Sequence, residues 1–272
     1  IGKVSGAQLT GNMRKQAANF GAEFVTTTVN DVDFGEEIKV IKTDKGEIKC
    51  DSVIVTQDTR VAIDNLFEEK IETDWAPRMR KNVTGSENVF VALGVKADLS
   101  HYPYSMVFPL KEKIEFAENE FSELRIYNYA KYSGFAPEGG TSLTCILLAP
   151  YYDYWKKAKL DGTYKEKKDA LAQKFIEAVS KFIPEVTKES VEVYDVATPL
   201  TYERYCSAYQ GSWMSIWKPK TSRFHYPQTI KNLEGVYFAG QRIMIPGGLP
   251  IAVYTGRRAV QLVCRDNDVE FV

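Results

Sequence analysis

The stretch that decides the fold lies near the end of the chain. There Gly235–Gly240, Gly-Val-Tyr-Phe-Ala-Gly, is followed by Pro246–Pro250, Pro-Gly-Gly-Leu-Pro. The first segment predicts a short buried strand that ends on glycine, and the second precedes a helix from Ile251 to about Cys264. A strand, a glycine-rich turn and a helix N-terminus predict a binding place for an anion or an electron-rich ring edge, because the first N–H groups of a helix lack intrahelical partners. Glycines also serve ordinary tight turns, and the spacing alone leaves that interpretation open.

The beginning of the chain predicts elements that suit the same domain. Ser5 and Gln8 form a capping box for a helix that ends near Gly21. We expect a strand over residues 23–29, a hairpin over 38–48, and a strand at Val53–Val55 that is buried on both faces. These elements cover the first 57 residues.

The middle of the chain predicts a separate sheet with a helix. Strand patterns cover residues 88–95, 123–129, 142–148 and 191–196. A long helix with one apolar face, from Leu171 to Phe182, precedes the last of them. The sequence therefore predicts a mixed α/β (α+β) fold.

Composition excludes several classes of function. The 272 residues carry 35 basic and 36 acidic side chains, so the basic excess of a nucleic-acid-binding protein is missing. Four separated cysteines without a C-x-x-C pair, and only two histidines, exclude a disulfide scaffold and a thiolate or histidine-rich metal site. The longest apolar run, Cys145–Ala149, is too short to span a bilayer. We expect a cytoplasmic protein without a metal, for which peripheral membrane contact and the oligomeric state stay open.

Several segments together resemble a known family. They are Val236–Gln241, Pro246–Pro250, Thr255–Ala259 and the Thr198–Tyr205 segment, Thr-Pro-Leu-Thr-Tyr-Glu-Arg-Tyr. In this order they resemble the C-terminal part of phytoene desaturase and carotenoid isomerase-like FAD-dependent oxidoreductases, to which amine oxidases are more distantly similar. The opening Leu9–Glu23 resembles thioredoxin reductases.

The resemblance implies a domain plan with one departure from the family. Residues 1–57 and 230–272 would form part of an FAD-binding domain, and residues 58–229 a mixed-sheet substrate domain. The family's Gly-x-Gly-x-x-Gly turn, which holds the FAD pyrophosphate, does not occur in this sequence. We therefore expect a fragment that binds FAD incompletely and is inactive alone. The thioredoxin reductase-like start also leaves a fused or spliced chain open.

The resemblance also implies which residues meet the cofactor. Backbone N–H groups after the glycine-rich turn would face the flavin carbonyl edge, where negative charge gathers on reduction. Val29 would lie near the adenine and Thr56 near the pyrophosphate, although both also suit plain strand positions. The residues of the flavin edge are Gly240, Gln241, Gly247, Gly248, Leu249 and Pro250.

A dense set of aromatic residues suggests a substrate channel. Tyr129, Tyr154, Trp155 and Trp213 could line a path for an apolar, unsaturated small molecule, although core packing is the commoner role of such rings. The implied function is FAD-dependent oxidation, reduction or isomerisation of that molecule, with no assigned catalytic side chain. The alternatives are an amine oxidase-like or thioredoxin reductase-like enzyme, or a non-catalytic domain that binds a lipid or a partner.

Overall fold

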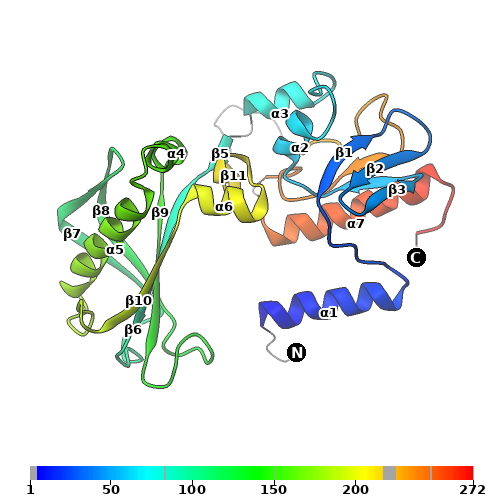
Figure 1. The fold of residues 1–272 in the computed structure, drawn as a ribbon. Helices are drawn as coiled ribbons and strands as arrows, with labels where there is room; N and C mark the ends of the chain where they lie inside the picture. Colours follow the sequence, from blue (N-terminus) through cyan, green and yellow to red (C-terminus); the bar gives the residue numbers. More distant parts are fainter. Residues whose placement is uncertain (1–4, 83, 150, 217–224, 246, 272) are drawn as a thin grey trace. The chain divides into compact units, whose positions relative to one another are not determined.

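The computed structural model describes residues 5–82, 84–149, 151–216, 225–245 and 247–271 (Figure 1). The chain divides into two compact units, Ile1–Asp51 and Ser52–Val272.

The first unit contains one helix and a small antiparallel sheet. Helix α1 (Gly6–Asn19) begins with the predicted capping box, in which Ser5 and Gln8 each accept a backbone N–H of the other. The sheet has the order β1-β2-β3. Its strands are β1 (Val29–Asp33), β2 (Lys39–Thr43) and β3 (Gly46–Cys50).

The strand expected over residues 23–29 is wrong in its position. The chain joins the sheet only at Val29, which pairs with Thr43 at the end of β2. The threonine-rich residues before Val29 have a high strand propensity, but β2 ends at Thr43, and beyond it the Asp44 N–H donates to the carbonyl of Thr28 at 3.3 Å before the chain turns away. Propensity alone therefore misplaced this strand.

The second unit contains a parallel strand pair from distant parts of the chain. Strand β4 (Val53–Val55) pairs in parallel with β12 (Val236–Phe238). Helix α7 (Leu249–Asp266) packs on β12, where Ala259 joins Tyr237 and Ala239 in a small core. Two short helices, α2 (Thr59–Asn65) and α3 (Ala76–Asn82), follow β4.

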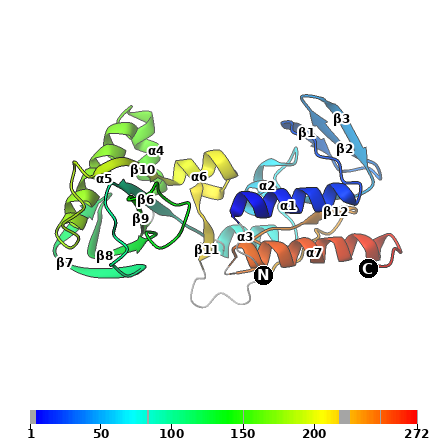
Figure 2. The same cartoon turned by 90° about the horizontal axis from the view of Figure 1, so that it is seen from below.

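The same unit contains a five-stranded antiparallel sheet in the order β10-β6-β9-β8-β7. Helices α4 and α5 lie on one side of it in both views (Figures 1 and 2). Side chains that alternate along β6 point into the core between sheet and helices, as Val91 and Leu93 do. These elements are β6 (Asn88–Val95), β7 (Ser105–Phe116), β8 (Asn119–Asn128), β9 (Thr141–Leu148), β10 (Val191–Ala197), α4 (Tyr152–Leu160) and α5 (Tyr164–Ser180).

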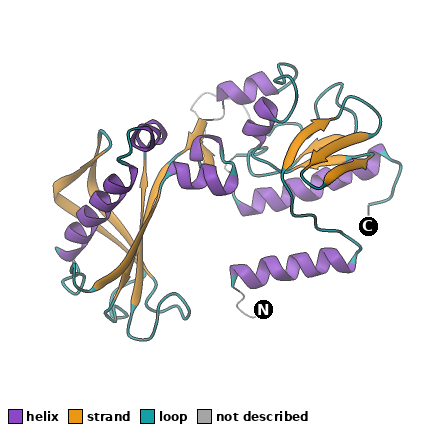
Figure 3. Cartoon of the chain, viewed as in Figure 1, coloured by secondary structure: helices purple, strands orange, loops and turns teal. Residues whose placement is uncertain are grey.

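A short connecting region follows the sheet along the chain. Helix α6 (Pro199–Cys206) and the 3₁₀ turn η1 (Tyr209–Gly211) come after β10. Strands β5 (Thr84–Ser86) and β11 (Met214–Ile216) form a two-stranded ribbon next to them (Figure 3). Among the helices of the described ranges, none is long and apolar enough to cross a bilayer. The mixed α/β fold is confirmed, while the proposed domain boundaries stay a prediction.

Two neighbouring leucines of β9 test which face of the sheet is the core. Leu147 is 4% exposed and Leu148 is 57% exposed. We expect Leu147→Ala to lower the free energy of unfolding by about 2–5 kcal/mol, because it leaves a cavity. Leu148→Ala should cost less than about 1 kcal/mol in the same urea titration. Equal losses would contradict this assignment of the two faces.

Candidate functional site

The carboxyl ends of the parallel pair form the candidate site. Strand β4 ends at Val55 and β12 at Phe238, and the backbone N–H of Ala239 still donates to the carbonyl of Val55 at 3.0 Å. At Gly240, where φ is +136°, an added Cβ would lie 3.9 Å from the carbonyl oxygen of Thr56. The two loops thus leave the same edge side by side, which is where α/β sheets bind ligands.

A buried ion pair fixes these loops. Arg242 Nε donates to Asp58 Oδ2 at 2.9 Å, and both side chains are almost fully buried. Asp58 also accepts the backbone N–H groups of Arg60 and Tyr209, each at 3.0 Å. Arg242 further donates to the carbonyl and hydroxyl of Ser212. A buried pair with this many partners holds three chain segments together.

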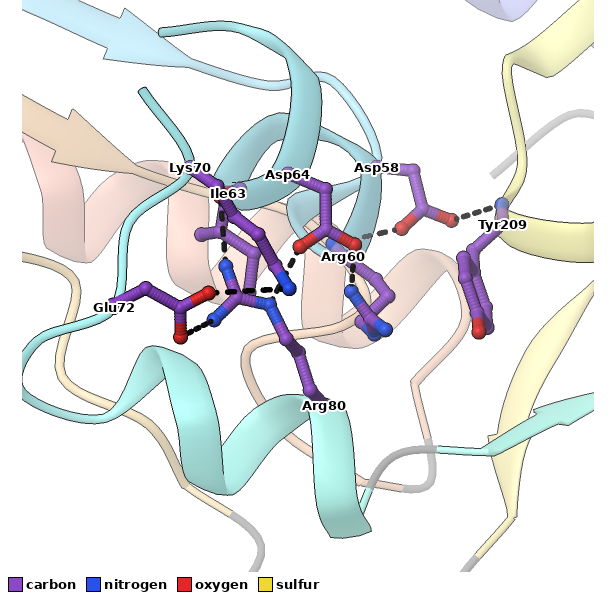
Figure 4. Close-up of polar contacts among 8 residues, drawn as sticks. All are labelled: Asp58, Arg60, Ile63, Asp64, Lys70, Glu72, Arg80 and Tyr209. Carbon is purple, nitrogen blue, oxygen red and sulfur yellow. Dashed lines mark hydrogen bonds and ion pairs between the residues drawn. The ribbon is translucent and has the colours of Figure 1, made fainter.

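A second charged cluster lies beside Asp58, on helices α2 and α3 and the loop between them (Figure 4). Arg80 donates to Asp64 at 2.6 Å and to Glu72 at 3.0 Å, and Asp64 also pairs with Arg60. The guanidinium of Arg60 stacks over the ring of Tyr209 at 4.5 Å. Because these charges pair with one another, the cluster is structural and is not proposed as a ligand site.

The turn before α7 depends on two glycines and one glutamine. Gly247 and Gly248 have φ values of +92° and +82°, which other residues adopt only with strain. The backbone N–H of Gly248 donates to the side-chain oxygen of Gln241 at 3.1 Å. An added Cβ at Gly247 would lie 3.0 Å from the carbonyl oxygen of Gln241. Gln241 therefore closes this turn.

The start of α7 offers backbone donors at the same edge. Gly248 is its N-cap residue, and no side chain of the described residues caps it. Leu249 is 67% exposed, so this end lies at the surface. Thr255 Oγ1 accepts the N–H of Gly240 at 3.0 Å and thereby ties α7 to the end of β12. A helix start of this kind suits an electron-rich group.

The structure brings together most of the residues that the sequence assigned to the flavin. Gly240 and Gln241 lie with Gly247–Pro250 at the carboxyl edge, and Thr56 lies on the neighbouring loop. Val29 belongs to the other unit, as the first residue of β1. Pro246 lies outside the described residues. Their roles toward a cofactor stay predictions.

The comparison with protein families places the chain. Residues 24–264 match the model of the flavin containing amine oxidoreductases. The chain belongs to this family. This is a family of FAD-dependent oxidoreductases, which confirms FAD as the predicted cofactor.

Individual proteins with solved structures share the fold of this flavin amine oxidoreductase chain. Cyclohexylamine oxidase from Brevibacterium oxydans IH-35A superposes with a TM-score of 0.59 at 12% identity, over 89% of this chain and 48% of that one. Putrescine oxidase bound to putrescine gives a TM-score of 0.61 at 12% identity, over 95% and 53%. This chain therefore spans about half the length of these structures.

A further relative matches a shorter segment. Thioredoxin reductase from Peptoclostridium litorale is 46% identical over 55 residues, which are 20% of this chain and 18% of that protein. The similarity is confined to this segment and assigns no further family to the chain.

The carboxyl edge fits one part of FAD. The N–H groups at Leu249 and Ile251 would serve the carbonyl edge of the flavin ring, where negative charge gathers on reduction, while Pro250 has no N–H. A dinucleotide's phosphates are commonly held by a Gly-x-Gly-x-x-Gly turn, and the sequence has none. The described donor set thus suits the ring edge and not the pyrophosphate.

The four aromatic residues assigned to the substrate do not form one wall. Trp155 is fully buried, with the rings of Phe116, Tyr154 and Tyr164 at 5.3–5.7 Å. It is a core residue and not a channel residue, because α4 turns it with Ala158 toward the sheet.

The other three aromatic residues lie on separate elements. Tyr154 is half-buried against Phe116, and Tyr129 lies in the loop after β8. Trp213 precedes β11 and is partly exposed. Core packing thus explains Trp155, while the roles of the other three stay predictions.

Sequence reasoning missed the ion pair of Asp58 and Arg242. Each of the two residues follows a predicted apolar strand. A charged residue just beyond the end of a buried strand was therefore the one sequence signal that could have indicated a functional position. Nothing in a single sequence pairs two residues that are 184 positions apart.

Removing the arginine tests how much this pair contributes. In Arg242→Ala the Asp58 carboxylate stays buried without its cation, and we expect a loss of about 3–5 kcal/mol in the free energy of unfolding. The matched control is Lys181→Ala, which breaks an exposed ion pair with Glu112 and should cost less than about 1 kcal/mol. Denaturant titration measures both, and a small loss for Arg242→Ala would show that the segments are held in another way.

Proposed function

We propose that this chain supplies the flavin-edge and substrate-binding parts of an FAD-dependent oxidoreductase that acts on an apolar, unsaturated small molecule. The observation that supports an apolar substrate is the helix-free face of the five-stranded sheet. This is the face opposite α4 and α5, and it is defined by the residues that alternate with the core residues.

On this face β6 and β9 carry no charged side chain, whereas β8 carries Glu123 and Arg125, and β10 carries Asp195 opposite Ala92. Phe90 and Ala92 of β6 point to it, and in the antiparallel register Ile146 and Thr144 of β9 lie opposite them, while Leu148 lies opposite Asn88. Exposed apolar residues also extend to the outer strands, where Val193 of β10 is 64% exposed. An apolar face of this extent favours an apolar ligand, because covering it removes apolar surface from water.

The lack of a side chain at Gly94 makes room for Val193 of β10 on this face. An added Cβ at Gly94 would lie 2.6 Å from Cγ1 of Val193. The Val193 side chain therefore packs against the backbone of β6 at Gly94, and any residue with a Cβ at position 94 would displace it. In the proposed function this face orients the substrate and excludes water, and the flavin supplies the hydride chemistry when bound.

An amine is the second candidate substrate, because the matched family is described by amine oxidoreductases. A protonated amine needs a carboxylate partner. On this face the described residues of β6 and β9 supply none, and the carboxylates of Glu123 and Asp195 on the flanking strands already pair with Arg125 at 3.3 Å and Lys168 at 3.4 Å. A thioredoxin reductase-like reaction is disfavoured because the sequence has no C-x-x-C or C-x₄-C pair.

A binding experiment separates the two substrate classes. All-trans-retinol, a fluorescent polyene, should bind the chain, and Leu148→Asp should weaken this binding about tenfold, which corresponds to about 1.4 kcal/mol. The control Leu160→Asp changes an exposed leucine of α4, away from the face, and should bind retinol normally. Saturable binding of cyclohexylamine in place of retinol, or an equal effect of both variants, would contradict an apolar substrate.

The absence of the Gly-x-Gly-x-x-Gly turn gives a prediction for the cofactor. The 272-residue chain should lose FAD on gel filtration and show no oxidase activity, because the ring-edge donors act without the phosphate contacts. Absorbance at the flavin wavelengths measures the FAD retained per chain. A yellow complex with one FAD per chain would overturn the fragment hypothesis.

A further inference from the structure

One uncharged polar side chain lies in the middle of the helix-free face. Thr144 belongs to β9, the central strand of the five-stranded sheet. Its side chain points away from α4 and α5, because it alternates along β9 with Leu143 and Cys145, which belong to the core between sheet and helices. In the register of the sheet, Thr144 lies between Ala92 of β6 and Tyr127 of β8.

The hydroxyl of Thr144 has no hydrogen-bond partner among the described residues. The residue is only 8% exposed, and its Oγ1 atom is buried. A hydroxyl that leaves water without finding a partner costs free energy in folding. A valine has the same shape and would avoid this cost, so folding alone does not explain a threonine at this position. An orphaned polar group of this kind is a candidate for contact with a ligand.

Another threonine of the same strand provides a comparison. Thr141 points to the opposite face and is fully buried, beside Val95 of the core. Its hydroxyl donates to the carbonyl of Ala97 at 2.7 Å and accepts the N–H of Leu99 at 3.1 Å. The hydroxyl of Thr141 is thus used within the chain, whereas the hydroxyl of Thr144 is not.

The surroundings of Thr144 on this face are apolar. Ala92 lies opposite Thr144 itself, and Phe90 lies opposite Ile146 at the next position of the same face. The carboxylates of β8 and β10 on this face already form ion pairs with basic side chains. A ligand that covers the middle of the face therefore meets apolar surface around one hydrogen-bond donor, a combination that fixes the orientation of an apolar molecule.

We propose that Thr144 determines the specificity of the helix-free face by donating a hydrogen bond to a hydroxyl or carbonyl oxygen of the substrate. This inference rests on the proposed function, and it narrows the apolar, unsaturated substrate to one that carries such an oxygen. An analogue without the oxygen leaves the buried hydroxyl unpaired, so the face discriminates against it. The side chain of Tyr127, which is half-buried, shifts to admit the oxygen, as side chains at binding sites commonly do.

The test compares two polyenes that differ only in the oxygen. Retinol ends in a hydroxymethyl group, and axerophthene is the hydrocarbon with a methyl group in its place. Quenching of tryptophan fluorescence gives the Kd of each for the unchanged chain and for Thr144→Val. We expect the variant to lower the preference for retinol over axerophthene about fivefold, because valine cannot donate a hydrogen bond to the retinol oxygen.

The stability of two variants separates this role from a structural one. Thr144→Val replaces an unpartnered hydroxyl with a methyl group, so the midpoint of its urea titration should stay unchanged or rise. The matched control Thr141→Val makes the same exchange on the opposite face, where the hydroxyl has two partners. It should lower the urea midpoint and leave the preference for retinol unchanged.

The possible results distinguish this inference from the proposed function. An unchanged preference for retinol in Thr144→Val would overturn the role of Thr144, and so would an equal loss of preference in both threonine variants. If retinol still binds and Leu148→Asp weakens that binding, such a result leaves the proposed function in place. If neither polyene binds the chain, the proposed function fails, and the role of Thr144 fails with it.

Discussion

The candidate site depends on the buried ion pair of Asp58 and Arg242. Taking two charges out of water costs several kcal/mol per ion unless their hydrogen-bonding groups find partners. Here the carboxylate accepts two backbone N–H groups besides the arginine, and the arginine also reaches Ser212. These contacts form only when the loop after β4, the loop after β12 and Tyr209–Ser212 are in place together. The pair therefore locks a parallel ladder of two three-residue strands, which would be marginal by itself.

The segment that reaches this ion pair has an unusual backbone for the same reason. Ser207, Gln210 and Gly211 all have positive φ, near +50° to +60°. At Gly211 an added Cβ would lie 1.9 Å from the carbonyl oxygen of Pro199, so no other residue fits this path. The strained backbone is compensated by Ser212, whose carbonyl and hydroxyl accept from Arg242. The path of the chain from the five-stranded sheet to the strand pair is thus fixed by steric exclusion at Gly211 and by hydrogen bonds to Arg242 at Ser212.

Local sequence patterns were enough to predict much of the fold, and they failed where strand pairing with distant residues determines the structure. The apolar periodicity of α5 and α7 and the strand pattern of β6, β9 and β10 are visible within each segment, and the structure contains all of them. Strand β7 (Ser105–Phe116) was missed because Pro109 and the charged residues after it interrupt the pattern. An edge strand tolerates both, since only one side is paired and the ladder is irregular between Pro109 and Ile114. Trp155 was misassigned because aromatic density was given more weight than its helical spacing with Ala158.

The difference between local patterns and long-range contacts also explains which residues of the candidate site could be predicted from the sequence. Gly240, Gly247 and Gly248 could be found from the sequence because their positive φ is a local requirement. The role of Gln241 could not, because it depends on where the turn brings Gly248, whose N–H its side-chain oxygen accepts. That oxygen is already engaged within the protein, so in the proposed flavin edge Gln241 would act chiefly by shaping the turn from which α7 starts. The donors that such an edge requires then come from the backbone, whose geometry the glycines fix, and side-chain identity there matters mainly through the turn it permits.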